Sequence, residues 1–200
     1  LFQSAAESSF DTWMKFFDRN ENASNTTISY YDKGAALGLL LDLKIRHETN
    51  NKKSLDNVMR TLYEKFYKEK KLGFTDREFR EECEDAAGCA LPKIFDDYVA
   101  TVKEFDYPKY FAYAGLEIDV KPEEQPGVFF GAAAREQDGN LIISSVEWDS
   151  PAQQSGLSAQ DEILALDGIR ATPRTLDRCL DAKKPGDRVR VLISRRGMIQ

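Results

Sequence analysis

The stretch Ser29–Thr49 reads SYYDKGAALGLLLDLKIRHET, and its length and apolar content predict a long buried helix. Two adjacent tyrosines, Tyr30 and Tyr31, stand at its start, and one acid, Asp42, lies in its middle. Asp42 precedes Arg46 by four residues, a spacing that places both side chains on one face of a helix. Because a lone buried charge is costly, we expect Asp42 to have a structural ion-pair partner rather than a catalytic role.

The chain around this stretch is predicted to be helical up to about Tyr113. Apolar residues recur at helical spacing, and several segments follow residues that typically cap helices. Thr75 and Glu78 form a capping box before one segment, and Gly88 is placed to end it. The apolar positions of two other segments are Phe10, Trp13, Met14 and Phe17, and Leu55, Val58, Met59, Leu62 and Phe66. We therefore predict an α-helical domain over residues 1–115.

The composition changes at Lys121–Gly127, which reads KPEEQPG and is typical of an extended linker. Beyond it the apolar residues alternate with a period of two, which indicates strands, and Asp138–Asn140 and Asp167–Gly168 have the composition of tight turns. The predicted strands are Val128–Ala134, Leu141–Val146, Glu162–Leu166 and Val189–Ile193. We expect an α+β chain with a linker at residues 116–126 and a second domain at 127–200.

Composition narrows the possible functions. The 200 residues are 42% hydrophobic and 31% charged, which is ordinary for a globular chain, and the net charge of -6 gives nucleic-acid binding no electrostatic support. The longest apolar run, Ala35–Leu41, is far shorter than the roughly 20 residues that span a bilayer, so no membrane span is expected. Three cysteines provide no disulfide framework. Leu1 in place of a methionine indicates that the chain is a piece of a longer protein.

The run Ser150–Ala171, SPAQQSGLSAQDEILALDGIRA, resembles a PDZ domain of the bacterial, circularly permuted kind, a β-sandwich or barrel. With PGDRVRVLISRRG as a late strand, the resemblance covers roughly Gly127–Gln200. PDZ domains add an extended peptide to a sheet edge and hold its terminal carboxylate with backbone N–H groups, so a carboxyl-terminal peptide is the implied partner. The implied groove residues are Phe129, Phe130, Gly131 and Ala132 in the carboxylate-holding loop, and Leu176, Cys179 and Leu180 on the facing helix.

The same residues also fit a simpler interpretation. Phe129 and Phe130 then fill the core of the sandwich, and the groove holds no ligand. Ala132 stands where related domains carry a larger apolar residue, which leaves the chemistry of the pocket open.

The opening stretch resembles the region downstream of the active site in the glycyl aminopeptidase family, zinc metallopeptidases of the gluzincin type that often carry a PDZ domain. Supporting runs are SSFDTWMKFF at Ser8–Phe17, GFTDREF at Gly73–Phe79, and FDDYVATVKEFDYPKYFAYAGLEI at Phe95–Ile118. The resemblance therefore covers almost the whole chain and implies the carboxyl-terminal portion of such an enzyme. One departure is YVATVKE, where the family tends to have Gly-Thr after Tyr-Val.

Tyr31-Asp32-Lys33-Gly34 matches the Tyr-Glu-Lys-Gly element of the wider gluzincin aminopeptidases, with aspartate in place of glutamate. The resemblance implies that Tyr31 is catalytic, its phenol donating a hydrogen bond to the oxyanion of the tetrahedral intermediate. A neutral phenol suffices, since its reference pKa of about 10 keeps the proton in place at neutral pH. Tyr30 is then a packing or substrate-lining residue. The simpler interpretation of Tyr31 is a core tyrosine with a satisfied hydroxyl.

The sequence contains no His-Glu-x-x-His motif and one histidine, His47, whereas a gluzincin zinc site needs two histidines, a glutamate between them and a further carboxylate. We therefore expect zinc in the parent protein to be held by ligands outside this chain, and no cofactor and no peptidase activity in the chain alone. The resemblance implies a bacterial parent, in the cytoplasm or periplasm, that removes small amino-terminal residues such as glycine or alanine from peptide or protein substrates.

A second hypothesis is a non-catalytic helical adaptor whose PDZ domain binds peptide or protein carboxyl termini. A His-Glu-x-x-His motif upstream of Leu1 in the parent reading frame favours the peptidase, and its absence there favours the adaptor. The actual substrate, the PDZ ligand, the role of the groove, the oligomeric state and the compartment stay open.

Overall fold

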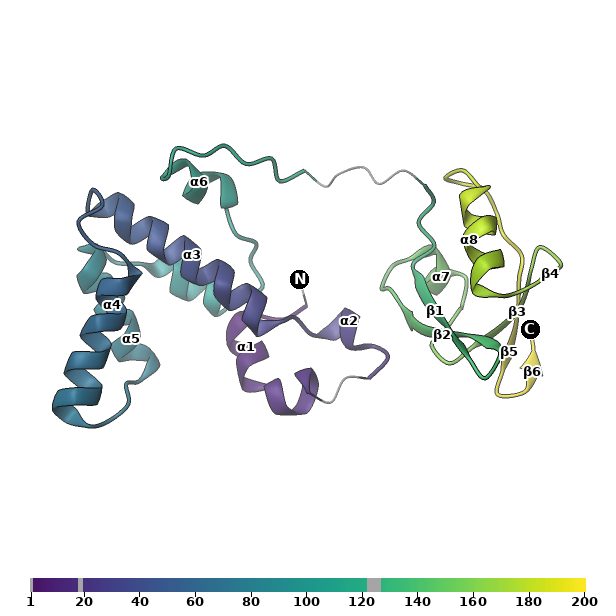
Figure 1. Cartoon of the computed structure of the whole chain (residues 1–200), viewed down its shortest axis with the longest axis horizontal. Helices are drawn as coiled ribbons and strands as arrows, with labels where there is room; N and C mark the ends of the chain where they lie inside the picture. The colour runs from purple at the N-terminus through teal and green to yellow at the C-terminus, as the bar shows by residue number, and fades with distance from the viewer. Residues whose placement is uncertain (1, 18–19, 122–126) are drawn as a thin grey trace. The chain divides into compact units, whose positions relative to one another are not determined.

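The computed structural model describes residues 2–17, 20–121 and 127–200, which divide into two compact units. One unit holds the described residues up to 17 and from 27 to 121, and the other holds those from 20 to 26 and from 127 onward. The first is drawn as helices and the second as a small sheet with helices (Figure 1), so the α+β fold class is confirmed. The domain boundaries near 115 and 127 stay predictions, and most of the predicted linker, 122–126, lies outside the described residues.

Helix α3 (Tyr30–Glu48), the helix predicted from the opening stretch, is the central element of the helical unit. It contacts most of the other helices of this unit, and its residues Leu40, Leu41 and Ile45 are buried in the core. The contacting elements are α1 (Ala5–Phe10), α4 (Leu55–Leu62), α5 (Asp76–Ala87), α6 (Tyr107–Ala112) and η3 (Lys93–Val99). Two further segments with the wider turns of a π-helix are η1 (Thr12–Phe16) and η2 (Tyr63–Lys70). Within the described ranges, no helix is long and apolar enough to cross a membrane.

Asp42 has the structural role that its spacing predicts. One carboxylate oxygen accepts a hydrogen bond from Arg46 Nε at 2.6 Å, which confirms the expected ion pair. The other oxygen accepts from the backbone N–H of Leu55 at 2.8 Å, at the first residue of α4. The side chain therefore joins the middle of α3 to the start of α4, where backbone N–H groups lack partners within the helix.

The apolar repeat at Phe10, Trp13, Met14 and Phe17 does not form a buried helix face. Ser4 caps α1, which ends at Phe10, and the wider turn η1 follows, so the four residues do not share one regular helix. Phe10 is 83% exposed and Trp13 is 80% exposed, and the Trp13 ring stacks on Phe17 with 5.0 Å between ring centroids. An apolar surface therefore faces outward from this part of the helical unit.

The second unit contains an antiparallel sheet with strand order β1-β2-β3-β5-β6, in which β4 also pairs with β3. The predicted strand at Val128–Ala134 is wrong in its first half, because Gly131 has a φ of +76° and the strand begins at Ala132. The strands are β1 (Ala132–Gln137), β2 (Asn140–Val146), β3 (Glu162–Leu166), β4 (Ile169–Arg170), β5 (Val191–Arg195) and β6 (Met198–Ile199). The helices are α2 (Ala23–Thr26), α7 (Pro151–Gln154) and α8 (Pro173–Asp181).

The predicted turn at Asp138–Asn140 is confirmed. Gln137 pairs with Asn140, so Asp138 and Gly139 form a two-residue hairpin loop with φ values of +52° and +78°. Positive φ at both central positions is the geometry whose twist matches a β-hairpin, and Asp-Gly tolerates it well. The hairpin fixes the register in which β1 runs along the edge of the sheet.

An ion pair between the buried Asp161 and the half-buried Arg195 joins the residue before β3 to strand β5. Asp161 is almost fully buried, and its two oxygens accept from Arg195 Nε and from a terminal Arg195 nitrogen, each at 2.7 Å. The backbone N–H of Ser158 donates a third hydrogen bond at 2.8 Å. Burial acts to raise the pKa of Asp161, but the hydrogen bonds from Arg195 and Ser158 outweigh it and leave the pKa below its ordinary value.

This pair makes the stability of the PDZ-like unit depend on acidity. Because the folded pKa of Asp161 is lowered, its stabilisation is complete above the unfolded value of about 3.9 and is lost as the pH falls through the folded pKa. Asp161→Ala should lower the free energy of unfolding by about 3 kcal/mol at neutral pH, because it removes the buried carboxylate and leaves Arg195 with Gly156 O as its acceptor. Hydrogen exchange of the β2 and β3 amides measures this unit alone.

Asp161→Asn is the control for the acid dependence. It keeps the shape of the side chain and has no charge to titrate, so its stability should change less between about pH 5 and pH 2 than that of the unaltered protein. Parallel stability curves for the two proteins would show that Asp161 does not carry this dependence.

Candidate functional site

The edge strand β1 and helix α8 form the walls of the candidate peptide groove. β1 is the end strand of the sheet order, so one side of it has no strand partner among the described residues. α8 packs against β1 and β3, with Thr172 and Thr175 forming the capping box at its start. Ala132 and Ala134 are half-buried against the core from the β1 side. A strand edge beside a helix is the arrangement that accepts an added peptide strand.

The backbone at the start of β1 presents its hydrogen-bonding groups to this open edge. Ala132 lies opposite Val146, and the flanking hydrogen bond runs from Glu147 N to Gly131 O at 2.9 Å. This pattern makes Ala132 and Val146 a non-hydrogen-bonded pair, in which the N–H and C=O of Ala132 point away from β2. Ala132 can therefore pair with a strand added at the edge.

The loop before β1 has its carbonyl groups tied to the body of the unit. Ala152 N donates to Phe130 O at 3.1 Å, and Ser150 Oγ donates to Gly131 O at 3.1 Å. Because C=O and N–H point in opposite directions across a trans peptide, these bonds turn the N–H groups of Gly131 and Ala132 the other way. No described acceptor is recorded for the N–H groups of Phe129, Phe130 and Gly131. Successive outward N–H groups next to a residue with positive φ are suited to bind an anion.

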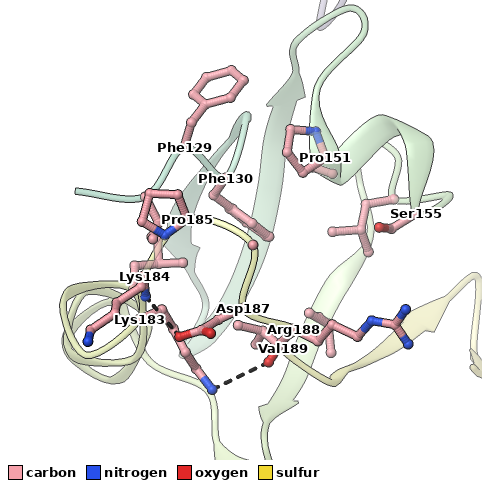
Figure 2. Close-up of a pocket in the computed structure, with 16 residues that line it drawn as sticks. Phe129, Phe130, Pro151, Ser155, Lys183, Lys184, Pro185, Asp187, Arg188 and Val189 are labelled. Carbon is pink, nitrogen blue, oxygen red and sulfur yellow. Dashed lines mark hydrogen bonds between the residues drawn. The ribbon is translucent and has the colours of Figure 1, made fainter. Parts of the chain in front are cut away.

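A cavity of about 710 Å³ lies beside this loop. Figure 2 shows the Phe130 side chain directed into it and the Phe129 ring directed away from Phe130. Leu180 at the end of α8 and Val189 before β5 contribute further apolar wall. Lys183 lies at the rim, where its ammonium group bonds to Asp167 at 2.8 Å and to a backbone oxygen.

The structure brings together some of the predicted groove residues and separates others. Phe129, Phe130 and Leu180 line the cavity, whereas Leu176 is buried in the core. Cys179 lines another, smaller cavity, of about 270 Å³, with Leu166 and Ile169. Gly131 and Ala132 are not among the residues that line the cavity and lie at the start of β1. The role of all seven residues in peptide binding stays a prediction.

The second candidate site is the start of α3. Tyr31 is 60% exposed, so it is not a core tyrosine, and its ring lies against that of Tyr30 with 4.2 Å between centroids. A hydrogen bond with Tyr31, together with burial, raises the pKa of Tyr30.

Lys33, two residues further on, points the other way. It is 9% exposed, its ammonium group is 3.5 Å from Thr101 O, and it lies over the Phe105 ring at 5.6 Å. Burial lowers the pKa of Lys33, and the charge of Glu7 partly opposes the effect. A cavity of about 530 Å³ is lined by Lys33, Asp32 and Phe105, and Tyr31 is not among its lining residues. In the Tyr-Asp-Lys-Gly element, the phenol of Tyr31 is therefore exposed and the side chain of Lys33 is buried.

The described residues offer no place for a metal ion. His47 lies in the last turn of α3, and its ring stacks on Tyr113 at 3.9 Å between centroids. Among the residues that the structure describes, no group of three histidine, cysteine, aspartate or glutamate side chains is arranged to hold a metal. Two carboxylates of this helix are engaged in ion pairs, Asp42 with Arg46 and Glu48 with Lys44.

Known proteins resemble both units. A model of the M61 glycyl aminopeptidases matches residues 1–37, the segment that carries Tyr31. A PDZ domain model matches residues 128–200. The chain is similar to the M61 glycyl aminopeptidases. The resemblance to this family and to PDZ domains that the sequence indicates is thereby confirmed.

A solved structure extends the similarity over both units. It is described as an aminopeptidase N family protein from Idiomarina loihiensis, and it matches 100% of this chain with a TM-score of 0.83 and 30% sequence identity. The chain spans 36% of the length of that aminopeptidase-family protein. Among curated proteins, none matches the chain at a significant level.

Sequence reasoning missed two parts of the PDZ domain's groove and one feature of the helical unit. The sequence indicates that Ser150 starts a helix. It does not indicate that Ser150 donates a hydrogen bond to Gly131 O, nineteen residues earlier. The loop that carries Lys183 and Val189 has no periodic pattern that would place it beside Phe130. The opposite orientations of Tyr31 and Lys33 follow from helix spacing only once the buried face of α3 is known.

Gly131→Ala should disrupt the PDZ domain far more than Gly139→Ala. Both glycines have nearly the same positive φ, +76° and +78°, so the backbone strain of an alanine is matched. A Cβ at Gly131 lies 2.1 Å from Ser150 Cβ, whereas one at Gly139 meets nothing within 4 Å. Chemical denaturation should show a loss of about 1 kcal/mol for Gly139→Ala and a clearly larger loss for Gly131→Ala. Equal losses would mean that the Ser150 contact imposes no constraint.

Proposed function

We propose that this chain is the carboxyl-terminal part of a zinc-dependent, M61-type aminopeptidase, in which the helical unit contributes Tyr31 to the active site and the PDZ domain binds an extended peptide. The observation that carries the peptide-binding part is the outward N–H and C=O of Ala132 at the open edge of β1. The similarity of residues 1–37 to the glycyl aminopeptidases supports the peptidase part. Because the chain spans 36% of the length of its relative, the activity belongs to the larger protein.

The groove favours a peptide that ends in an apolar residue with its own carboxylate. The last residue of the peptide pairs with Ala132, and its terminal carboxylate meets the outward N–H groups of Gly131 and Ala132. The last side chain then enters the cavity walled by Phe130 and Leu180. A hydrogen bond to a charged acceptor contributes about 1.5–3 kcal/mol, which is the basis of a preference for a charged terminus.

Peptide capture is tested with an acetylated octapeptide that ends in valine, supplied as the acid and as the amide. The acid should bind at least about tenfold more tightly by titration calorimetry, because the amide removes the charge that the loop N–H groups hold. Equal affinity for both peptides, or binding of neither, would contradict carboxylate capture.

Two neighbouring residues of α8 give a matched pair of variants for the same titration. Leu180→Lys places a charge in the cavity beside Phe130 and should weaken binding of the acid peptide about tenfold or more. Cys179→Lys makes the same kind of change at a half-buried position that lines the other cavity, so its affinity should change much less. A larger loss of affinity for Cys179→Lys than for Leu180→Lys would contradict binding in the cavity beside Phe130, because Cys179 lines the other cavity.

The zinc that the family implies does not fit the described residues, since His47 is stacked on Tyr113 and no ligand cluster is present among them. We propose that its ligands belong to a part of the protein outside this chain. What this chain supplies is a phenol that is exposed at the first turn of α3 and hydrogen-bonded with Tyr30. A phenol at this position can donate a hydrogen bond to a developing oxyanion.

The exposed apolar surface at Phe10, Trp13, Met14 and Phe17 supports this arrangement. Monomeric domains rarely expose a cluster of large apolar side chains to solvent, and such a cluster often marks an interface. We propose that the remaining part of the peptidase covers it. Parts of one enzyme that meet over such a surface can bring Tyr31 to a reaction centre that this chain does not itself contain.

Tyr31→Phe in the full-length parent should lower kcat on alanine and glycine p-nitroanilides by about 10²-fold, the scale for loss of one oxyanion donor, with bound zinc unchanged. Tyr67→Phe is the matched control, because Tyr67 is also exposed on a helix and also lies against a second tyrosine, Tyr63. Its kcat should stay near that of the unaltered enzyme. Unchanged turnover in Tyr31→Phe would remove this residue from the mechanism.

The alternative is a non-catalytic adaptor that binds carboxyl termini. The single histidine of the sequence favours it as far as this chain alone is concerned. A His-Glu-x-x-His motif in the reading frame before Leu1, with zinc bound by the full-length protein, would decide for the peptidase. Its absence, together with peptide binding by the PDZ domain, would decide for the adaptor.

A further inference from the structure

Ser150 occupies an unusual position at the entrance of the groove. It is the N-cap of α7, its side chain is fully buried at 0% exposure, and its Oγ accepts from Gln153 N at 3.2 Å. The same oxygen is 3.1 Å from Gly131 O. Because Gln153 N is a donor and Gly131 O can only accept, the hydroxyl proton has to point to Gly131. One side chain thus joins a helix start to the loop before β1.

The hydrogen bond from Ser150 occupies the second acceptor position of the Gly131 carbonyl oxygen. A carbonyl oxygen has two lone pairs, and here one accepts from Glu147 N at 2.9 Å and the other from Ser150 Oγ. The peptide group between Gly131 and Ala132 is therefore held at both acceptor positions. Its N–H, on Ala132, is turned to the open edge of β1 as a consequence.

The cap of α7 by itself does not require serine. Aspartate and asparagine cap helices as well as serine does, but an ionised aspartate has no proton to donate to Gly131 O. The space between residues 131 and 150 is also small. A Cβ placed on Gly131 would lie 2.6 Å from Ser150 Oγ and 2.1 Å from Ser150 Cβ. The position needs a small side chain that accepts from one group and donates to another.

We propose that Ser150 is a positioning residue for peptide capture, whose hydroxyl orients the Gly131–Ala132 peptide so that its N–H faces the bound strand and its carboxylate end. The proposal rests on the peptide-binding function proposed above. Ser150 does not touch the ligand, because Gly131 lies between its hydroxyl and the open edge. It therefore acts on the selectivity of the groove for a charged terminus.

The affinity test uses the acetylated valine-terminated octapeptide as acid and as amide. Ser150→Ala should weaken binding of the acid about tenfold, while binding of the amide changes little, so the ratio of the two affinities falls. Ser150→Thr keeps the hydroxyl and should restore most of the ratio. A loss that is equal for both peptides, or no loss, would overturn the proposal, because a general weakening of the fold affects both ligands alike.

A second measurement needs no peptide and separates this proposal from the function on which it rests. When the Gly131 carbonyl is released, the Glu147 amide that donates to it should exchange with solvent about tenfold faster in Ser150→Ala. The Ile143 amide, in strand β2 just before Glu147, donates to Asp161 O and is the internal control. Unchanged exchange at Glu147 would overturn the role of Ser150.

The two measurements fail separately. If the unaltered protein binds neither peptide, the proposed peptide capture fails, while the exchange of Glu147 still decides whether Ser150 orients the loop. If Ser150→Ala does not fold, Ser150→Cys, which keeps the size and weakens the donated hydrogen bond, replaces it in both measurements with smaller shifts in the same direction. A normal affinity ratio and normal exchange in Ser150→Cys would then overturn the proposal.

Discussion

The carbonyl oxygen of Gly131 is the point on which the binding end of the PDZ domain depends. It accepts hydrogen bonds from Glu147 N and Ser150 Oγ, and these bonds connect the loop before β1 with the end of β2 and the start of α7. A backbone carbonyl that is satisfied twice leaves the peptide group no freedom to rotate. The outward direction of the next N–H, on Ala132, is the direct consequence. The open edge of β1 is therefore prepared before any ligand arrives, which reduces the ordering cost of binding.

The helical unit uses a half-buried acid in a comparable way. Asp42 satisfies Arg46 on its own helix and the N–H of Leu55 at the start of α4. Asp161 does the same in the PDZ domain, where Arg195 and Ser158 N share its oxygens. In both places a carboxylate with several donors connects elements that apolar packing alone would leave free to slide. The desolvation of each acid is offset because several of its acceptor positions are used.

The exposed apolar residues and the exposed phenol of Tyr31 raise the same question, which is what part of the proposed peptidase lies against the helical unit. Their helical spacing made Phe10 and Trp13 candidates for the core, but both are exposed to solvent in the described part of the chain. Large relatives offer an explanation, since this chain spans 36% of the aminopeptidase-family protein that it matches. In the function proposed above, another part of the peptidase covers these side chains.

The sequence by itself determined the two kinds of architecture, the buried helix with its Asp42–Arg46 pair, the turn at Asp138–Gly139 and the resemblance to glycyl aminopeptidases and PDZ domains. These features are local, because helix spacing, capping and turn conformation act over a few residues. Only the tertiary structure decided that the strand begins after Gly131, that Cys179 faces away from Phe130, and that Ser150 reaches Gly131 O. Contacts between residues nineteen positions apart depend on how whole elements pack, and neither periodicity nor composition encodes that packing.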